Sequence, residues 1–155
     1  MKYKRLTKEE LGALEQEFIH FLAAAQITGN DWEKLKKDEP EVAEELIETF
    51  SDLVYEKVLD KVELLEYRDS KNLNIFKFEK DKIILVGLRV KENSDVDLTQ
   101  PDFFSKWKEE SSNTVTIIKT ERVYTAAKEI EVFDLISNGC IITDEKLFNL
   151  IKSMA

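Results

Sequence analysis

Glu17 and His20 are the first residues in this sequence whose types and spacing could do chemistry. They stand three apart, the Glu-x-x-His spacing that places two ligands on one face of a di-iron helix. Such a site needs a second Glu-x-x-His pair and two further carboxylates, but His20 is the single histidine of the chain. Together with Cys140, the single cysteine, it also cannot supply the four ligands of a zinc site. We therefore expect no metal or other cofactor, and we place His20 at the surface or boundary of an amphipathic helix.

Nucleophilic and phosphate-binding chemistry also lack their usual residues. Cys140 precedes Ile141 and Ile142, so a buried and inert thiol is favoured over a reactive Cys–His pair. The four scattered glycines form no Gly-x-Ser-x-Gly elbow, phosphate loop or dinucleotide fingerprint. We therefore predict no catalytic residue from a motif. Carboxylate chemistry stays open, because the chain has 32 acidic residues.

The most distinctive pattern is a stripe of carboxylates along one predicted helix. Residues three and four apart are neighbours on a helix surface, and like charges at that spacing cost about 0.2–0.5 kcal/mol per pair. The favoured interpretation is a solvated face opposite the apolar one. The alternative is a docking surface for a basic protein partner or for the basic N-terminal segment of a second copy. This candidate interaction surface, called the acidic stripe below, consists of Glu41, Glu45, Glu48, Asp52, Glu56 and Asp60.

The charge distribution is uneven and argues against nucleic-acid binding. Residues 1–8 hold four basic groups and no acid, whereas residues 9–66 hold 17 acids against 5 bases. Residues 67–155 are nearly balanced, with 15 acids and 14 bases, within a net charge of −9. Affinity for nucleic acid comes largely from lysine and arginine neutralising phosphates, so nucleic-acid binding is disfavoured.

The elements that would position these residues begin with helices. Thr7 and Glu10 form the pattern of a capping box, and the apolar spacing that follows predicts one amphipathic helix ending near Ala25. Thr28 or Asn30 can cap a short helix, and Pro40 suits the first turn of a long helix over 40–62.

The period then becomes that of strands. Residues 74–79 and 82–90 predict a β-hairpin, preceded by a strand over 64–68 and followed by a fourth strand over 114–124. A short helix capped by Thr99 carries Phe103, Phe104 and Trp107, which we expect to fill the core. A helix stopped by Asn138 and Gly139 and a last helix capped by Thr143 complete the chain.

These elements predict an α+β fold. An N-terminal helical region packs on a small, mainly antiparallel four-stranded sheet with two C-terminal helices. No linker interrupts the composition, so we predict a single domain over 1–155, with a helical half at 1–66 and a β-rich half at 67–155. No apolar run is long enough for a membrane span or a signal peptide, and we expect a cytoplasmic protein that contacts no membrane.

Four segments resemble an uncharacterised bacterial family, known only as a domain of unknown function of about this length. They are residues 1–7 (MKYKRLT), 27–34 (ITGNDWEK), 50–54 (FSDLV) and the hairpin around 75–77 (IFK). The resemblance spans most of the chain. It implies a bacterial cytoplasmic origin and supplies no activity, ligand or catalytic residue.

Two hypotheses about function follow. The first is a non-enzymatic interaction or regulatory module that uses the acidic stripe or, if it is exposed, the aromatic cluster of Phe103, Phe104 and Trp107. The second is an enzyme with a carboxylate-based active site in a cleft between the helical and β-rich halves.

Overall fold

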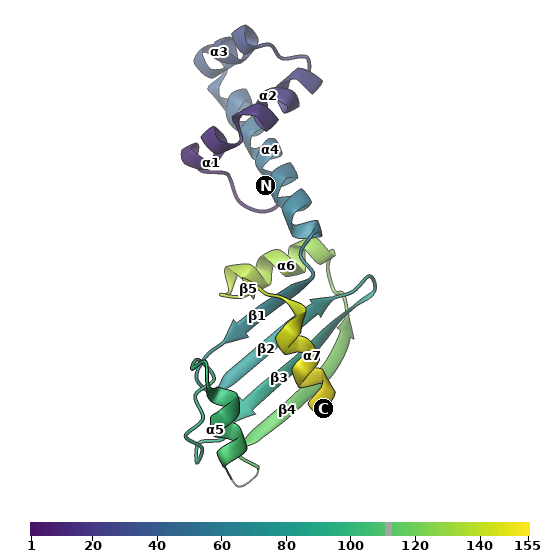
Figure 1. The fold of residues 1–155 in the computed structure, drawn as a ribbon. Coiled ribbons are helices and arrows are strands. Elements are labelled where there is room, and N and C mark those ends of the chain that lie inside the picture. Colours follow the sequence, from purple (N-terminus) through teal and green to yellow (C-terminus); the bar gives the residue numbers. More distant parts are fainter. Residues whose placement is uncertain (111–112) are drawn as a thin grey trace. The chain divides into compact units, whose positions relative to one another are not determined.

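The computed structural model describes residues 1–110 and 113–155, and the chain forms two compact units. Residues 1–60 form a helical unit and residues 61–155 form a sheet unit (Figure 1). The α+β fold class is confirmed, with N-terminal helices, an antiparallel sheet and C-terminal helices. The boundary lies at residues 60–61 rather than 66–67, because the first strand already belongs to the sheet. A single domain over 1–155 stays a prediction.

Four helices build the helical unit, and two of them begin with capping boxes: the predicted one at Thr7 and a second at Thr28, where the sequence predicted only a cap by Thr28 or Asn30. Thr7 and Thr28 each accept a hydrogen bond from the backbone N–H three residues on, and Glu10 and Asp31 return the bond. Pro40 opens the longest helix, as predicted. The helices are α1 (Lys8–Ala13), α2 (Glu15–Ala24), α3 (Gly29–Asp38) and α4 (Pro40–Asp60).

The prediction of one continuous helix up to Ala25 is wrong, because the backbone breaks at Leu14. This residue has φ −107° and ψ 26° and separates α1 from α2. The break allows both segments to approach α4. Leu14 lines a hollow together with Val54 of α4, while Phe18 of α2 packs on Phe50 with ring centroids 5.0 Å apart.

An aromatic cluster forms the centre of the helical unit. Phe18 contacts Trp32 edge-on at 5.1 Å, and Phe21 lies 5.4 Å from Phe50. Such ring pairs contribute about 0.5–1.5 kcal/mol beyond the area that they bury. Phe50 is buried, whereas Phe18, Phe21 and Trp32 are half-buried, so the cluster reaches the surface.

In its described residues, the sheet unit contains five antiparallel strands in the order β4-β3-β2-β1-β5. The predicted hairpin and the two flanking strands are confirmed, and β5 is an additional edge strand that the sequence did not reveal. The strands are β1 (Leu64–Arg68), β2 (Asn72–Phe78), β3 (Lys82–Val90), β4 (Val115–Val123) and β5 (Ile141–Ile142).

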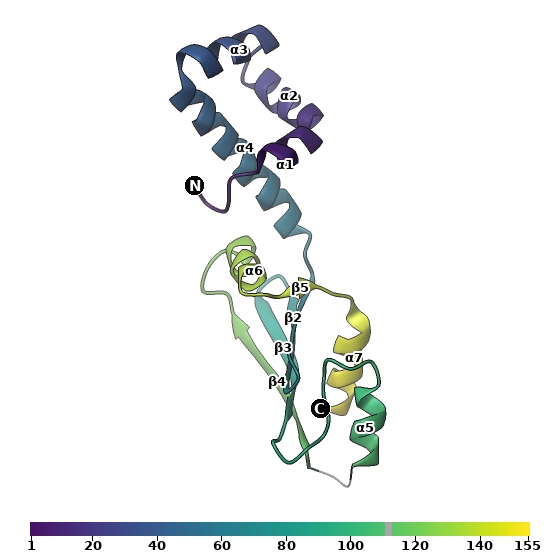
Figure 2. The same ribbon diagram turned by 90° about the vertical axis from the view of Figure 1, so that its left-hand side faces the viewer.

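Helices cover this sheet on two faces. Figure 2 shows α5 (Phe103–Glu109) and α7 (Glu145–Met154) on one face and α6 (Lys128–Ser137) on the other. Phe148 and Ile151 of α7 pack with Leu73, Ile75 and further side chains of β1 to β4 in a buried apolar core.

The aromatic side chains of α5 belong to the same core, as predicted. Phe103 is buried, and Phe104 and Trp107 are partly buried against the core cluster.

Two of the predicted caps are wrong. Asp102, not Thr99, precedes α5, and its side chain makes no capping bond. Asp144, not Thr143, caps α7 by accepting from the N–H of Lys146, because Thr143 is still bound to β1 through its own N–H. Gly139 ends α6 with φ 103°, the left-handed conformation expected of a glycine there.

Candidate functional site

The acidic stripe is occupied in part by the N-terminal segment of the same chain, defined here as residues 2–6. The backbone N–H of Lys2 donates to one carboxylate oxygen of Asp52 at 2.9 Å. The N–H of Tyr3 donates to the other oxygen at 3.0 Å. The Lys2 ammonium group pairs with Glu56 at 3.1 Å. Asp52 therefore holds two consecutive backbone groups of the segment.

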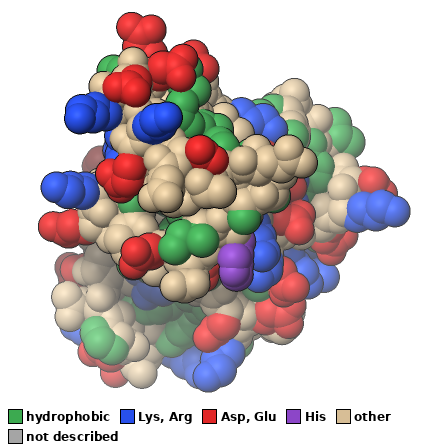
Figure 3. Space-filling view, turned by 90° about the horizontal axis from the view of Figure 1, so that it is seen from above, with side chains coloured by type: hydrophobic (Ala, Val, Ile, Leu, Met, Phe, Trp, Pro, Cys, Tyr) green, Lys and Arg blue, Asp and Glu red, His purple; other side chains and the backbone are tan. Residues whose placement is uncertain are grey.

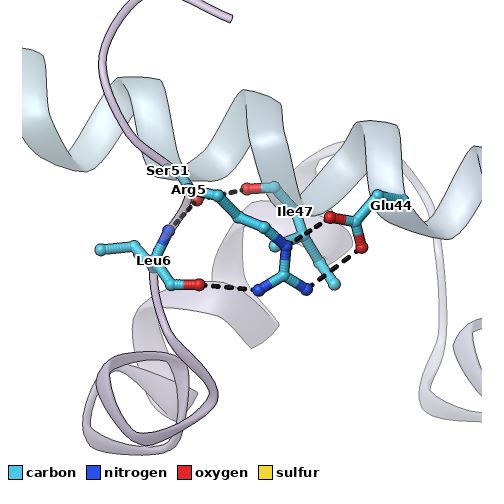
Figure 4. A network of polar contacts seen from close by, with 5 residues as sticks. All are labelled: Arg5, Leu6, Glu44, Ile47 and Ser51. Carbon is cyan, nitrogen blue, oxygen red and sulfur yellow. Dashed lines mark hydrogen bonds and ion pairs between the residues drawn. The ribbon is translucent and has the colours of Figure 1, made fainter.

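A second set of contacts fixes the other end of the segment (Figure 4). The Arg5 guanidinium donates from Nε and Nη2 to the two carboxylate oxygens of Glu44, and from Nη1 to the Leu6 carbonyl at 2.8 Å. The Leu6 N–H donates to Ser51 Oγ at 3.0 Å, and Ser51 Oγ donates to the Ile47 carbonyl at 2.7 Å. Ser51 is fully buried and Leu6 is 3% exposed, so this end of the segment belongs to the core of the helical unit.

The electrostatics of the Arg5–Glu44 pair follow from its geometry. The hydrogen bonds from Arg5 lower the pKa of Glu44. The same bonds raise the pKa of Arg5 above its usual value, and the nearby negative charge of Glu48 adds a smaller increase. Both side chains remain 38–44% exposed. An ion pair this exposed contributes about 0–1 kcal/mol and weakens as salt is added.

Residues 1–155 match the family model DUF6495, which is described as a family of unknown function. The chain belongs to this family. No curated protein and no solved structure matches the chain significantly. The expected membership in a family of unknown function is therefore confirmed.

In this member of DUF6495, the predicted stripe residues fall into distinct environments. Asp52 and Glu56 bind the N-terminal segment, and Glu48 lies close enough to Arg5 to influence its pKa. Glu41 and Glu45 are exposed at the N-terminal end of α4, and Asp60 is exposed at its C-terminal end.

One acidic residue of this surface is not part of the predicted stripe. Glu44 is three residues from Glu41 and four from Glu48, so the spacing rule admits it as readily as Glu45, which the stripe includes in its place. The spacing alone does not choose between the two. Only the contact with Arg5 identifies Glu44. The acidic stripe together with Glu44 is called the acidic α4 face below.

The other candidate residues have environments that the sequence anticipated in part. Cys140 is buried, and burial raises the pKa of its thiol, which disfavours the reactive thiolate. His20 is exposed on α2 and appears in purple at the surface in Figure 3, where acidic and basic side chains are interspersed.

Residues 1–110 and 113–155 contain no group of three or more His, Cys, Asp or Glu side chains that could hold a metal ion. Within the same ranges, no helix has the length and apolar character that crossing a membrane requires.

Proposed function

We propose that this protein is an interaction module that binds an extended basic segment of a partner protein on the acidic α4 face. The observation that carries the proposal is the N-terminal segment itself, which lies on this face through both its backbone and its side chains. A face that binds one basic segment has the chemistry to bind another of similar sequence.

The contacts define the partner's chemistry. Asp52 accepts from two consecutive backbone N–H groups, which favours an extended chain whose amides are free. Glu56 takes an ammonium group, and Glu44 takes a guanidinium through both of its oxygens, the arrangement for which arginine is better suited than lysine. The ligand class is therefore an extended segment with lysine and arginine three residues apart.

The N-terminal segment is the resident competitor for this face. Its ion pairs are exposed and individually weak, so a partner segment of higher charge can replace its basic residues without breaking the core of the unit. The exposed carboxylates of Glu41 and Glu45 extend the face beyond the resident contacts. Complementary charges of this kind raise association rates at low salt.

A peptide-binding experiment tests the proposal. A fluorescein-labelled peptide with the sequence of residues 1–8 is titrated into the full chain and into the K2Q/R5Q variant, and binding is followed by anisotropy. We expect tighter binding to the variant, because its own segment no longer holds Glu44 and Glu56. Adding E44Q and D52N to the variant should abolish the gain.

A matched control removes the same charge from the same region. Lys4 and Lys8 are exposed, and neither takes part in the contacts with α4 described above. The K4Q/K8Q variant has the same net charge as K2Q/R5Q and should bind the peptide as weakly as the unchanged protein. Equal binding by the two variants, with circular dichroism showing both folded, would overturn the proposal.

A further inference from the structure

The outer edge of β4 has no neighbouring strand in the described part of the chain. β4 is the first strand in the sheet order and pairs only with β3 there. Thr116 and residues 119–123 are exposed, and Val123 is 71% exposed. A nine-residue edge without proline is a template for another strand.

The hydrogen bonds of β3 determine which groups of β4 point outward. The Lys91 N–H donates to the Thr114 carbonyl at 2.8 Å, so this pair is hydrogen-bonded across the ladder. Because hydrogen-bonded pairs alternate in an antiparallel ladder, the backbone groups of 116, 118, 120 and 122 face β3. Those of 115, 117, 119, 121 and 123 therefore face away from the sheet. The Val123 carbonyl accepts from the Arg122 side chain at 3.3 Å, consistent with an outward acceptor.

We propose that the β4 edge binds the β4 edge of a second copy in an antiparallel, two-fold symmetric ladder with Thr120 opposite Thr120. Only the odd-numbered residues of β4 direct their backbone N–H and C=O groups away from the sheet. A two-fold symmetric ladder can therefore form only in registers that place odd-numbered residues opposite odd-numbered residues. A register centred on Lys119 or on Glu121 brings like charges directly opposite each other, which is destabilising.

The register centred on Thr120 is complementary in charge and in apolar character. It places Lys119 of each copy opposite Glu121 of the other, twice across the axis. It also places Ile117 opposite Val123, which gives the most exposed apolar residue of the strand an apolar neighbour. Each of these pairs would exchange two backbone hydrogen bonds. The occupant is a second copy because the edge is complementary to itself.

Two charged side chains of β4 next to the edge already have partners within the chain. Glu121 is 58% exposed and already accepts from Lys82 at 3.2 Å, which leaves it accessible to Lys119 of a second copy. The Arg122 guanidinium pairs with the buried Glu131 at 2.7 Å and also donates to the Val123 carbonyl at 3.3 Å, so the Ile117 N–H of a second copy would share or replace that bond. The inference does not depend on the acidic α4 face.

Charge reversal tests the pairing in solution. Sedimentation velocity of the unchanged protein should show a dimer, and K119E should shift it to monomer because it places glutamate opposite Glu121. The double variant K119E/E121K restores opposite charges and should restore the dimer. A monomeric unchanged protein at its highest soluble concentration, or a dimer that K119E leaves intact, would overturn the inference.

A cysteine cross-link tests the register. Thr120 forms the non-hydrogen-bonded pair at the axis, where Cα atoms are about 4.5 Å apart and a disulfide can form. T120C should therefore give a disulfide-linked dimer on mild oxidation, and the buried Cys140 should not compete. T116C is the control, since its two copies would be about 27 Å apart along the ladder. Cross-linking of T116C but not T120C would contradict the register.

Discussion

The helical unit and the sheet unit are stabilised by different kinds of contact. Residues 1–60 bury few side chains completely, and one of these is the hydroxyl-bearing Ser51. Their N-terminal segment is held by carboxylates of α4 that remain near solvent. The sheet unit instead has a continuous apolar core between β1 to β4, α5 and α7. The first unit should therefore show a small response to charge, pH and salt in addition to its response to packing, and the second should respond mainly to changes in packing.

The largest expected effect is a cavity in the sheet unit. Phe148 is fully buried against the sheet, and F148A should lower the free energy of unfolding of this unit by about 3–5 kcal/mol. Hydrogen exchange should show lost protection in β2 and β3. F18A, in the half-buried cluster of the helical unit, should cost less. An equal or larger loss for F18A would remove the contrast between the two units.

Two glycines allow the same substitution to be compared in both units. A Cβ at Gly87 would lie 2.6 Å from the Leu73 carbonyl oxygen, so G87A must displace backbone of β2 and should destabilise the sheet unit by about 1–3 kcal/mol. A Cβ at Gly12 in α1 meets nothing within 4 Å, and alanine is the better helix former by about 1 kcal/mol. G12A should therefore stabilise the helical unit. Urea unfolding followed by circular dichroism should show opposite signs.

Removal of the buried Ser51 hydroxyl tests how firmly the N-terminal segment is attached to α4. S51A removes the acceptor of the Leu6 N–H inside the helical unit and should destabilise it by about 1–2 kcal/mol. Thr49 is exposed and bonds only back to the Glu45 carbonyl in the described structure, so T49A is the matched control and should have little effect. Hydrogen exchange at the backbone amides of residues 2–6 should be faster in S51A than in the unchanged protein, and T49A should leave it unchanged. Unchanged exchange in S51A would show that Ser51 does not anchor the segment.

The smallest expected effect concerns pH. Arg5 lowers the pKa of Glu44 below its value in the unfolded chain, so the pair stabilises the fold at neutral pH and this contribution disappears as the pH falls through the folded-state pKa. E44Q should cost at most about 1 kcal/mol at pH 7 and nothing at low pH. Urea unfolding of both proteins from neutral to acid pH measures this. If the free energies of unfolding of E44Q and the unchanged protein differ more at acid pH than at pH 7, the predicted direction of the pH dependence is wrong.

Much of the local structure could be predicted, because its causes lie within a few residues. Thr7 with Glu10 satisfies free N–H groups of α1, and two apolar strand-like segments on either side of the polar pair Lys80-Asp81 define the β2–β3 hairpin. The break at Leu14 could not be predicted, because it depends on the approach of α1 and α2 to α4. The two-residue β5 has no pattern of its own and forms only because β1 offers an edge.

The candidate surface could be predicted in part. The complementarity between a basic N-terminal segment and the acidic stripe is visible in the charges alone. Composition does not decide whether the segment binds its own helix or another molecule, and the structure places Lys2 and Arg5 on α4 of the same chain. Glu44 was missed because the spacing rule fits both Glu44 and Glu45 between Glu41 and Glu48, and only the contact with Arg5 distinguishes them.

The two tryptophans are divided between the units. Trp32 lies against Phe18 in the helical unit, and Trp107 lies against Phe104 in the sheet unit. Each unit therefore contains its own intrinsic fluorophore, and the chain has no other tryptophan. With W107F the emission reports on residues 1–60 alone, and with W32F on residues 61–155 alone, so the melting of each unit can be followed separately without an attached dye.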